Sequence, residues 1–400
     1  MYYYFALTQV VVYLLAIPLL DILLNVDSPH DLASLSVAGL FVASVVFGHF
    51  LSSPQKKRTE HYRAMHQFTA VGQLIIVLWC TIHITLCIQY GLYDRRIGTE
   101  TIALLFSGLS VYELIAIRAL EIFLPYLLTI ALFNARDGTG VLRYIVPVAL
   151  ISAFIASGAV NSRSQTLVLG LAVLILVQNV LPRRRLSRLL LIFTALGIAT
   201  ATLVTVNRVT QAYDVDATSY TQHEFVKRLD GLEIVSTLIK QGGVSLFGQS
   251  PETLLLPLIA AMPVSQRATE LKALALTTVK ANILENELSS NERDVNSFVI
   301  TDAYYLGGLL GTCLIGLLVG FVAKYIDRRV GLTKSPYIHL LLVACICDGL
   351  VLERESIGII ASVLRDWVLL IILMRVICIW KITSPTMSRF LLDCSRTPAA

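Results

Sequence analysis

Several arginines of this chain lie inside apolar runs or in a short turn next to one, where a positive charge is unexpected. Arg118 and Arg365 lie inside apolar runs, where a charge costs at least about 2.5–3.5 kcal/mol on insertion scales. Arg163 lies in the short turn VNSRSQ, where its charge adds to the positive end of the helix that follows. Because the planar fork of arginine binds phosphate oxygens bidentately and stays charged, these positions favour a phosphate-bearing ligand. Further arginines with the same potential are Arg208, Arg228, Arg293 and Arg354.

Local ion pairs are the alternative explanation for the same arginines. Arg118 and Glu121 are three residues apart, and Glu224 precedes Arg228 by four, so each pair shares one helical face. Such pairs contribute only about 0.2–0.5 kcal/mol each. An arginine near a membrane surface can also extend its charge into water without binding a ligand. The residues alone leave both explanations open.

Carboxylates close to these arginines could take the proton of an attacking hydroxyl group. The candidates are Glu113, which opens the same apolar run as Arg118, Asp230, which follows Arg228, and Asp302, at the start of a later apolar run. The chain contains no nucleophile elbow, P-loop or HExxH motif. Its residues give no argument for a metal ion, so we expect acid–base chemistry carried by side chains.

The composition is that of a polytopic membrane protein. Hydrophobic residues make up 56% of the 400 residues and charged residues 15%, and the mean hydropathy is +0.73. A soluble domain is typically about a quarter charged. The net charge of +5 does not indicate a nucleic-acid partner, because an excess of Lys and Arg in such a chain mostly records topology. Most of the seven cysteines lie in apolar runs, as small buried hydrophobes do.

The pattern of apolar runs predicts ten membrane spans, since each needs about 20 residues. Lysine and arginine gather in four segments that connect spans, including RRRLSR at 183–188, and in the tail after the last span. All five fall on one side when the spans alternate, and the positive-inside rule makes that side cytoplasmic. Both termini are then cytoplasmic. The predicted spans cover residues 4–24, 32–51, 68–90, 112–133, 143–161, 165–181, 189–206, 303–323, 336–353 and 358–380.

The segment 207–302 falls outside the cytoplasm and is too long for a passive connection. Thr221 and Glu224 fit a capping box that opens a helix, which ends at Gly242 and Gly243. The stretch PETLLLPLIAAMPVS is apolar but too short to cross, which predicts a re-entrant or interfacial segment. A second amphipathic helix follows. The predicted organisation is spans one to seven in 1–206, a helical cap in 207–302, spans eight to ten in 303–380 and a cytoplasmic tail in 381–400.

Three local patches resemble the O-antigen polymerases of the Wzy type. VNSRSQTLVLGLAVLILV looks like the family's arginine-bearing turn leading into an apolar span, and VKRLDGLEIV looks like its arginine-containing loop helix. NSFVITDAYYLGGLLGTCLIGLLVG looks like the Asn-Phe, Tyr and Gly-rich start of the span after the loop. The architecture is similar over most of the chain. The paired Arg-x10-Gly motif of some members is not matched, because Arg163, Arg208 and Arg228 lack a Gly eleven residues on.

The resemblance implies an all-α, GT-C-like glycosyltransferase of the bacterial inner membrane whose active site faces the periplasm. Such enzymes join undecaprenyl-pyrophosphate-linked repeat units without a metal or another cofactor. Arg163 and Arg228 would stabilise the pyrophosphate leaving group, and Asp230, Glu113 or Asp302 would deprotonate the acceptor hydroxyl. The remaining substrate contacts would be Arg118, Arg208, Arg293, Tyr304, Tyr305, Arg354 and Arg365, with the tyrosines stacking on sugar rings.

Two other functions fit the same features. An O-antigen ligase shares the fold, the long outer loop and the arginines, but transfers the glycan to lipid A core. A transporter or flippase predicts broken, repeated spans and a cavity that alternates between faces. Membrane lipids are expected partners of all three, and a chain-length regulator is a further expected partner of a polymerase.

Overall fold

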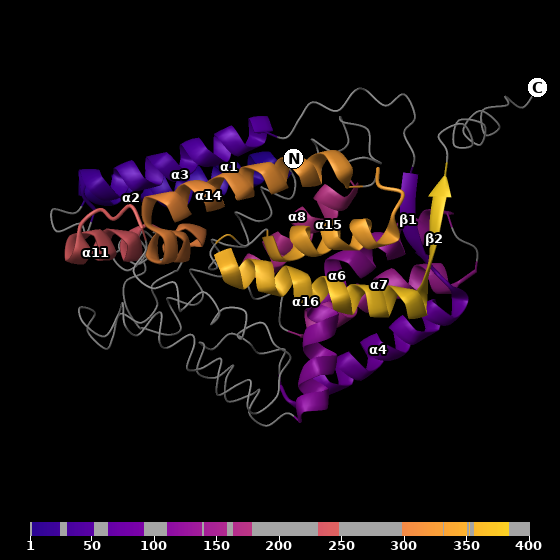
Figure 1. Cartoon of the computed structure of the whole chain (residues 1–400). Helices are drawn as coiled ribbons and strands as arrows, with labels where there is room; N and C mark the ends of the chain where they lie inside the picture. The colour runs from indigo at the N-terminus through magenta and orange to yellow at the C-terminus, as the bar shows by residue number, and fades with distance from the viewer. Residues whose placement is uncertain are drawn as a thin grey trace, which may run out of the picture. The chain divides into compact units, whose positions relative to one another are not determined.

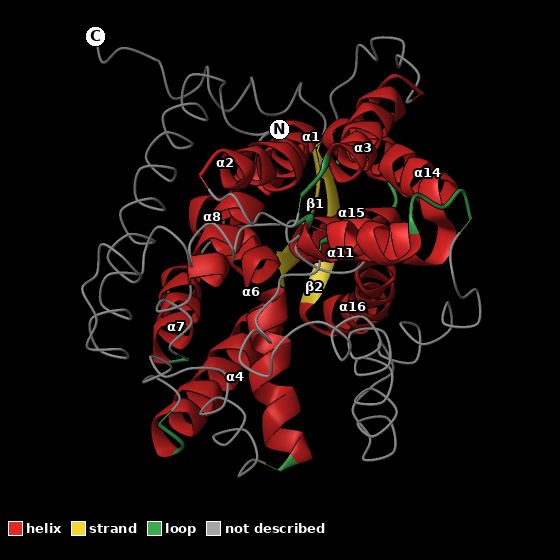
Figure 2. Ribbon diagram, turned by 90° about the vertical axis from the view of Figure 1, so that its left-hand side faces the viewer, coloured by secondary structure: helices red, strands yellow, loops and turns green. Residues whose placement is uncertain are grey.

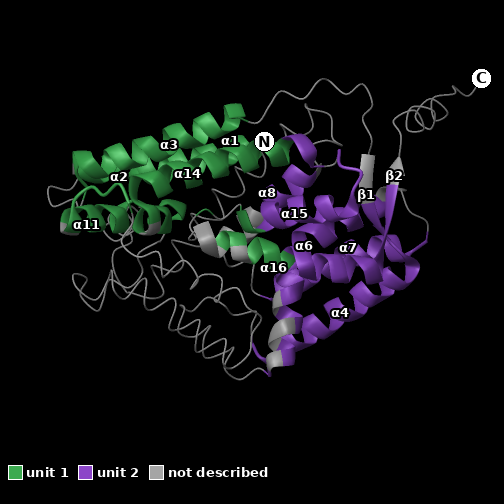
Figure 3. Cartoon of the chain, viewed as in Figure 1, with its two compact units in different colours: residues 1–54, 213–327, 348–366 green, residues 55–212, 328–347, 367–400 purple. Residues whose placement is uncertain are grey.

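In the computed structural model, the chain divides into two compact units (Figure 3). Unit 1 comprises residues 1–54, 213–327 and 348–366, and unit 2 comprises residues 55–212, 328–347 and 367–400. The structure describes residues 2–24, 30–51, 63–91, 110–137, 140–157, 163–177, 231–247, 298–330, 332–349, 352 and 356–383.

Unit 1 is built from apolar helices. Its elements are α1 (Tyr2–Val11), the π-helix η1 (Val12–Ala16), α2 (Ile17–Leu24), α3 (Leu32–Leu51), α11 (Glu233–Gly242), most of α14 (Val299–Arg329) and the first half of α16 (Ser356–Ile377). The backbone stays in the right-handed helical region on both sides of η1. The first three elements therefore form one apolar run, Tyr2–Leu23, that is long enough to cross a membrane.

Asp327, near the end of α14, caps the N-terminus of α1. Its two carboxylate oxygens accept hydrogen bonds from the backbone N–H groups of Tyr2, at 2.8 Å, and Tyr3, at 3.0 Å. The first four N–H groups of a helix have no partner within the helix, and a negative charge there also opposes the helix dipole. A residue more than 300 positions away therefore caps α1.

Glycines let α3 and α14 approach backbone to backbone. A Cβ atom added at Gly320 would lie 1.9 Å from the carbonyl oxygen of Val45, and one added at Gly48 would lie 2.2 Å from that of Leu317. Small residues bring helices together in membranes, where contact between backbones replaces hydrophobic collapse. Larger side chains at these two glycines would force the helices apart.

The span predicted at 303–323 is broken. Helix α14 begins at Val299, and Gly308 inside it has φ 57° and ψ −143°, values that favour glycine. The break turns the chain back sharply, because a Cβ added at Gly311 would lie 2.2 Å from the carbonyl oxygen of Ala303. Figure 1 shows the short first piece as a separate orange helix beside α11 and below the long piece of α14. Only the second piece, within Gly307–Arg329, has the length and hydropathy of a span.

The segment after α11 satisfies the backbone groups that the break exposes. The N–H groups of Leu309 and Leu310 donate to the carbonyl oxygens of Ser245, at 3.0 Å, and Leu246, at 3.3 Å. These N–H groups open the second piece of α14 and have no partner within it. The turn at Gly308 is therefore locked by a segment from the predicted cap.

Helix α11 packs its apolar face into unit 1, as the predicted apolar periodicity requires. The helix ends at Gly243, where φ is 70°, which confirms the predicted stop at this glycine pair. It begins at Glu233, after a bend at Gly231 and Leu232, so a helix running unbroken from Thr221 is wrong. The predicted capping residues lie outside the described residues. The buried positions are Leu232, which precedes the helix, and Ile234, Val235, Ser236, Leu238 and Ile239 within it.

Unit 2 packs three helices, α4, α7 and α8, against α6. Its elements are β1 (Arg63–Phe68), α4 (Ala70–Gln89), α6 (Val111–Asp137), α7 (Leu142–Ala156), α8 (Arg163–Val177), most of α15 (Pro336–Gly349), the second half of α16 and β2 (Cys378–Thr383). Helix α6 contacts α4, α7 and α8. Its Ile117, Leu120, Leu127 and Ile130 are almost fully buried, and their helical spacing explains why α6 lies at the centre.

The described residues are mostly helical, as the all-α prediction requires, and one small two-stranded sheet accompanies the helices. Strands β1 and β2 pair antiparallel, with Arg63 opposite Thr383 and Phe68 opposite Cys378, and both are yellow in Figure 2. Thr69 then starts α4, because its Oγ1 accepts from the N–H of Gly72 at 2.9 Å. The N–H of Thr69 donates to the carbonyl of Ile377 at 3.0 Å. The pairing ties the start of α4 to the end of α16.

Four helices among the described residues are long and apolar enough to cross a membrane. They are Tyr2–Leu23, Leu32–Leu51, Ala70–Gln89 and Gly307–Arg329. Shorter apolar helices lie at Ala119–Ala135, Leu142–Ala156 and Pro336–Gly349 and overlap three further predicted spans. The predicted span 189–206 lies outside the described residues, so the total of ten stays a prediction.

Candidate functional site

The strongest candidate site in unit 1 is an ion pair inside α16. The Nε of Arg365 donates to Oδ1 of Asp366 at 2.7 Å. The Asp366 side chain is 2% exposed and the Arg365 side chain 32% exposed. Helical neighbours do not normally face each other, so the guanidinium bends back along the helix to reach the carboxylate. The bond compensates the charge of an aspartate buried in an apolar helix.

This pairing leaves hydrogen-bonding capacity on both partners. Within the described residues, Oδ2 of Asp366 is buried and has no hydrogen-bond partner. Among the residues that the structure describes, Arg365 donates to Asp366 through Nε, so its two Nη groups form an edge that still carries N–H donors. That edge matches two oxygens of a phosphate group. A buried polar group without a partner is uncommon and calls for a functional explanation.

Two further aspartates lie in the part of unit 1 around the link from α15 to α16. Asp348 is the penultimate residue of α15 and is buried. Asp302 is buried on the short first piece of α14. One turn earlier, the N–H of Val299 donates to the carbonyl of Leu352 at 3.0 Å, which brings the start of α14 beside this link. The sequence-based role of Asp302 as a base stays a prediction.

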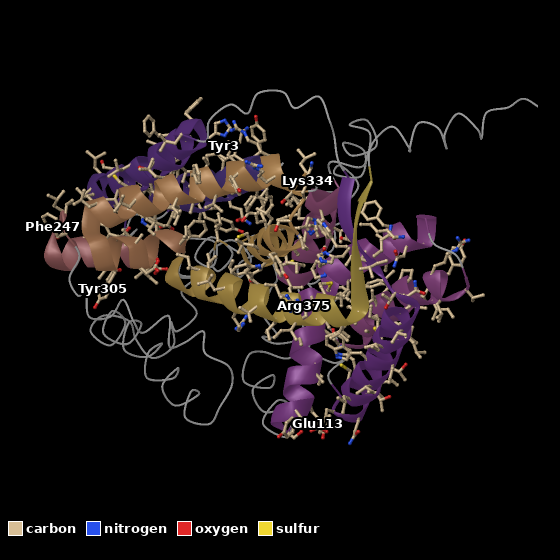
Figure 4. The ribbon with its side chains drawn as sticks, turned by 45° about the vertical axis from the view of Figure 1, so that its right-hand side comes forward. Tyr3, Glu113, Phe247, Tyr305, Lys334 and Arg375 are labelled. Atoms are coloured by element: carbon tan, nitrogen blue, oxygen red, sulfur yellow. The ribbon has the colours of Figure 1, made fainter. Side chains whose placement is uncertain are left out.

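The two predicted sugar-stacking tyrosines have different environments. Tyr304 is buried, and its hydroxyl donates to the carbonyl of Gly243 and accepts from the N–H of Ser245, each at 3.3 Å. It holds the 243–247 segment, which would have to move before a sugar could reach the ring. Tyr305 is partly exposed and points away from α11 and α14 (Figure 4). Of the two, Tyr305 is the one whose ring is accessible.

Glu113 belongs to unit 2 and has a structural explanation. Its Oε2 accepts from the N–H and the hydroxyl of Ser110, at 2.8 and 2.7 Å, and Oε1 accepts from the Tyr90 hydroxyl at 3.1 Å. Ser110 and Glu113 thus form a capping box at the start of α6, at the helix end labelled in Figure 4. Its catalytic role stays a prediction, and capping explains its contacts without one.

The positions of the other predicted residues are known only in part. Helix α8 begins at Arg163, as predicted for a turn leading into an apolar helix, and Arg118 lies on α6. The side chains of these two arginines lie outside the described part of the structure. So do five further predicted site residues: Arg208, Arg228, Asp230, Arg293 and Arg354.

Sequence reasoning missed a buried polar cluster that joins α11 to the rest of unit 1. Nδ1 of His30 and Oγ of Ser236 are 2.8 Å apart, and Nε2 of His30 lies 3.9 Å from Oδ2 of Asp21. Ser236 also donates to the carbonyl of Leu232 at 3.0 Å, so its hydroxyl accepts from His30. A serine that accepts from its histidine is not activated as a nucleophile. The cluster therefore fixes α11 in place. Asp21, a charge within the first apolar run, was the sequence signal for it.

A second missed cluster lies in unit 2. The Tyr126 hydroxyl is 2.6 Å from Nδ1 of His66 and 3.0 Å from Nδ1 of His339. Trp380 on β2 packs against both imidazoles, at ring-centroid distances of 4.7 and 5.2 Å. Burial lowers the pKa of His66 to about 4, which keeps its ring neutral at pH 7. All three hydrogen-bonding groups are buried, which indicates a structural role.

The described residues contain no group of three His, Cys, Asp or Glu side chains placed to hold a metal ion. Apolar helices with a few buried charges define a helical membrane protein as the class. No family model, curated protein or solved structure matches this chain. The functional argument therefore rests on the site residues and on the motifs in the sequence.

Proposed function

We propose that this chain is a membrane glycosyltransferase that polymerises undecaprenyl-pyrophosphate-linked oligosaccharide repeat units at the periplasmic face of the bacterial inner membrane. The observation that carries the proposal is the Arg365–Asp366 pair. It keeps a cation inside an apolar helix and leaves the two Nη groups of that cation available for a phosphate. The O-antigen polymerase-like motifs at Arg163 and Arg228 support the same substrate class.

The proposed reaction transfers the growing glycan from one lipid to the next repeat unit. The bond between the anomeric carbon and the pyrophosphate oxygen breaks, and a bond from that carbon to the acceptor oxygen forms. The acceptor proton goes to a carboxylate, for which Asp302, Asp230 and Glu113 are the candidates. Arginines held in place before the reaction stabilise the charge that develops on the leaving group. Undecaprenyl pyrophosphate is released.

The broken helix α14 favours a second candidate, a lipid or polysaccharide transporter. Discontinuous helices line the substrate sites of many transporters, and irregular backbone at membrane depth occurs where protein or a cavity surrounds it. Asp302 on the short piece of α14 would fit such a site. In this structure, however, Ser245 and Leu246 close the exposed N–H groups at the break, so the break is stabilised by protein.

Deleting the gene and separating the surface polysaccharide on a gel distinguishes the candidates. A polymerase deletion should leave a single repeat unit on the core, whereas a ligase deletion should leave bare core with long lipid-linked chains. A transporter deletion should leave no exported repeat. Either of the last two patterns would overturn the polymerase proposal.

The site itself can be tested with substitutions that separate charge from hydrogen bonding. Asp366→Asn keeps an oxygen acceptor for Arg365 but removes the negative charge, while Arg365→Lys keeps a positive charge but removes the fork. We expect Arg365→Lys to lose most polymerisation at normal protein levels. Normal chain lengths in both Arg365→Lys and Arg365→Ala would overturn the assignment of Arg365 to the phosphate.

A further inference from the structure

The second half of α16, in unit 2, exposes an apolar stripe that ends in a cation. Val368, Ile372 and Val376 are 52%, 59% and 62% exposed, and their spacing of four residues places them on one helical face. Arg375 follows Ile372 by three residues and is exposed on the same face. An apolar stripe of this kind suits acyl chains, and the arginine stands at its end.

Arg375 is held in a defined position by an aromatic residue. Its Nη2 donates to the hydroxyl of Tyr337 at 2.7 Å, and its guanidinium carbon lies 5.8 Å from the centre of the Tyr337 ring. Trp367 fixes that tyrosine in turn, because its Nε1 donates to the Tyr337 carbonyl at 2.9 Å. The guanidinium therefore loses little freedom when a ligand binds.

The remaining donors of Arg375 are open. Within the described part of the chain, Tyr337 is its hydrogen-bond partner, through one of the three guanidinium nitrogens. The Nε and Nη1 groups are left to bind an anion. Figure 4 labels Arg375 on the last turns of α16, just before β2 begins.

The sequence around Arg375 and Tyr337 is rich in cations. Residues 328–347 and 367–383, which belong to unit 2, contain no Asp or Glu. Their cations are Arg328, Arg329, Lys334, Arg375 and Lys381. The charge of this region complements an anionic surface, and cations with aromatic residues at helix ends are typical of the boundary between lipid and water.

We infer that Arg375 and Tyr337 form a binding site for the phosphate of an anionic phospholipid, whose acyl chains lie along Val368, Ile372 and Val376. The phosphate oxygens accept from Nε and Nη1 of Arg375, while the tyrosine hydroxyl keeps the guanidinium oriented. This site is independent of the proposed glycosyl transfer. It differs from general attraction to a charged surface because it needs the arginine fork and the tyrosine hydroxyl.

Native mass spectrometry of the purified full-length protein tests this site. The probes are phosphatidylglycerol, which is anionic, and phosphatidylcholine, which is zwitterionic. We expect wild-type protein to retain phosphatidylglycerol preferentially. Arg375→Gln and Arg375→Lys should each weaken that retention by about tenfold, because both lose the bidentate contact. Tyr337→Phe, which keeps the ring, should weaken it about threefold by releasing the guanidinium.

Lys240→Gln provides the matched control. Lys240 is exposed on α11 in unit 1, so the substitution removes one positive charge from a different surface, and retention should not change. Equal retention of the two lipids by wild-type protein would overturn the site. Wild-type retention in Arg375→Lys would also overturn it, because charge alone would then account for the binding. Displacement of the lipid by millimolar inorganic phosphate would show that no lipid is required and would overturn the lipid assignment.

Discussion

Two buried polar clusters differ in how fully their hydrogen-bonding groups are satisfied. In unit 2, the Tyr126 hydroxyl is hydrogen-bonded to both His66 and His339. The Trp380 ring packs against both imidazoles. In unit 1, Arg365 and Asp366 are charged and satisfy only part of each other's capacity. Matched neutral groups stabilise a fold, whereas a charged pair with donors left over is available for a ligand. The difference marks unit 1 as the place to look for substrate chemistry.

The largest effect should come from removing the shared hydroxyl in unit 2. Tyr126→Phe leaves two buried imidazole nitrogens without their partner, and each such loss costs about 1–3 kcal/mol. We expect the free energy of unfolding to fall by about 2–6 kcal/mol. Chemical unfolding of the purified protein would measure this. Polymerisation per folded molecule should stay normal in this variant. A loss of unfolding free energy below about 0.5 kcal/mol would show that the cluster does not hold unit 2 together.

Acid should weaken the same cluster. The pKa of His66 is about 4 in the folded protein and about 6.5 when unfolded, so between these values only the unfolded state binds the proton. Stability is therefore complete above pH 6.5 and falls by about 3 kcal/mol as the pH drops to 4. Unfolding should be compared between wild type and His66→Gln over this range. If both lose stability equally, His66 is not the responsible group.

The next effect concerns activity in unit 1. Arg365→Ala should reduce polymerisation about 100-fold, as the loss of a preorganised donor to a developing negative charge does. The reduction should appear as lost chain length in cells and as lost product with purified protein, at an unchanged amount of folded protein. The matched control is Arg375→Ala on the same helix, which should retain polymerisation. Equal loss of polymerisation in both variants would contradict the assignment of Arg365, and not Arg375, to the substrate pyrophosphate.

The smallest effect concerns Glu113. Glu113→Ala removes the capping box at the start of α6 and should lower stability by about 1 kcal/mol. Activity per folded molecule should be unchanged, because hydrogen bonds to Ser110 and Tyr90 account for the carboxylate. Glu113→Gln keeps one acceptor and should be milder. A collapse of activity in Glu113→Gln would instead identify Glu113 as the base.

Helix positions were predictable where the signal is local. The spans expected at 32–51 and 68–90 correspond to α3 and α4, because a long apolar run determines its own secondary structure in lipid. The glycine stop of α11 and the start of α8 at Arg163 likewise depend on neighbouring residues. These features needed no knowledge of tertiary contacts.

The features that were missed depend on distant partners. Gly307 and Gly308 look the same in sequence as glycines that pack helices, and the carbonyl groups that satisfy the backbone at the break come from Ser245 and Leu246, which are distant in sequence. The pairing of β1 with β2 joins residues more than 300 positions apart, beyond the reach of periodicity. Arg365 was recognisable as a buried cation, but its partner was not, because adjacent helical residues rarely pair. In a membrane helix, a buried charge is thus easier to recognise from the sequence than the residue with which it pairs.

The cap that Asp327 places on α1 also sets an order of events during synthesis. The first helix leaves the ribosome first, but its two N-terminal N–H groups receive their carboxylate only after Asp327 has been made. Until then, the beginning of α1 depends on water or lipid headgroups for hydrogen bonds. Unit 1 therefore reaches its final packing late, and a chain truncated before Asp327 should insert its first helix without anchoring it. Protease protection of nascent chains that end on either side of residue 327 would reveal that delay.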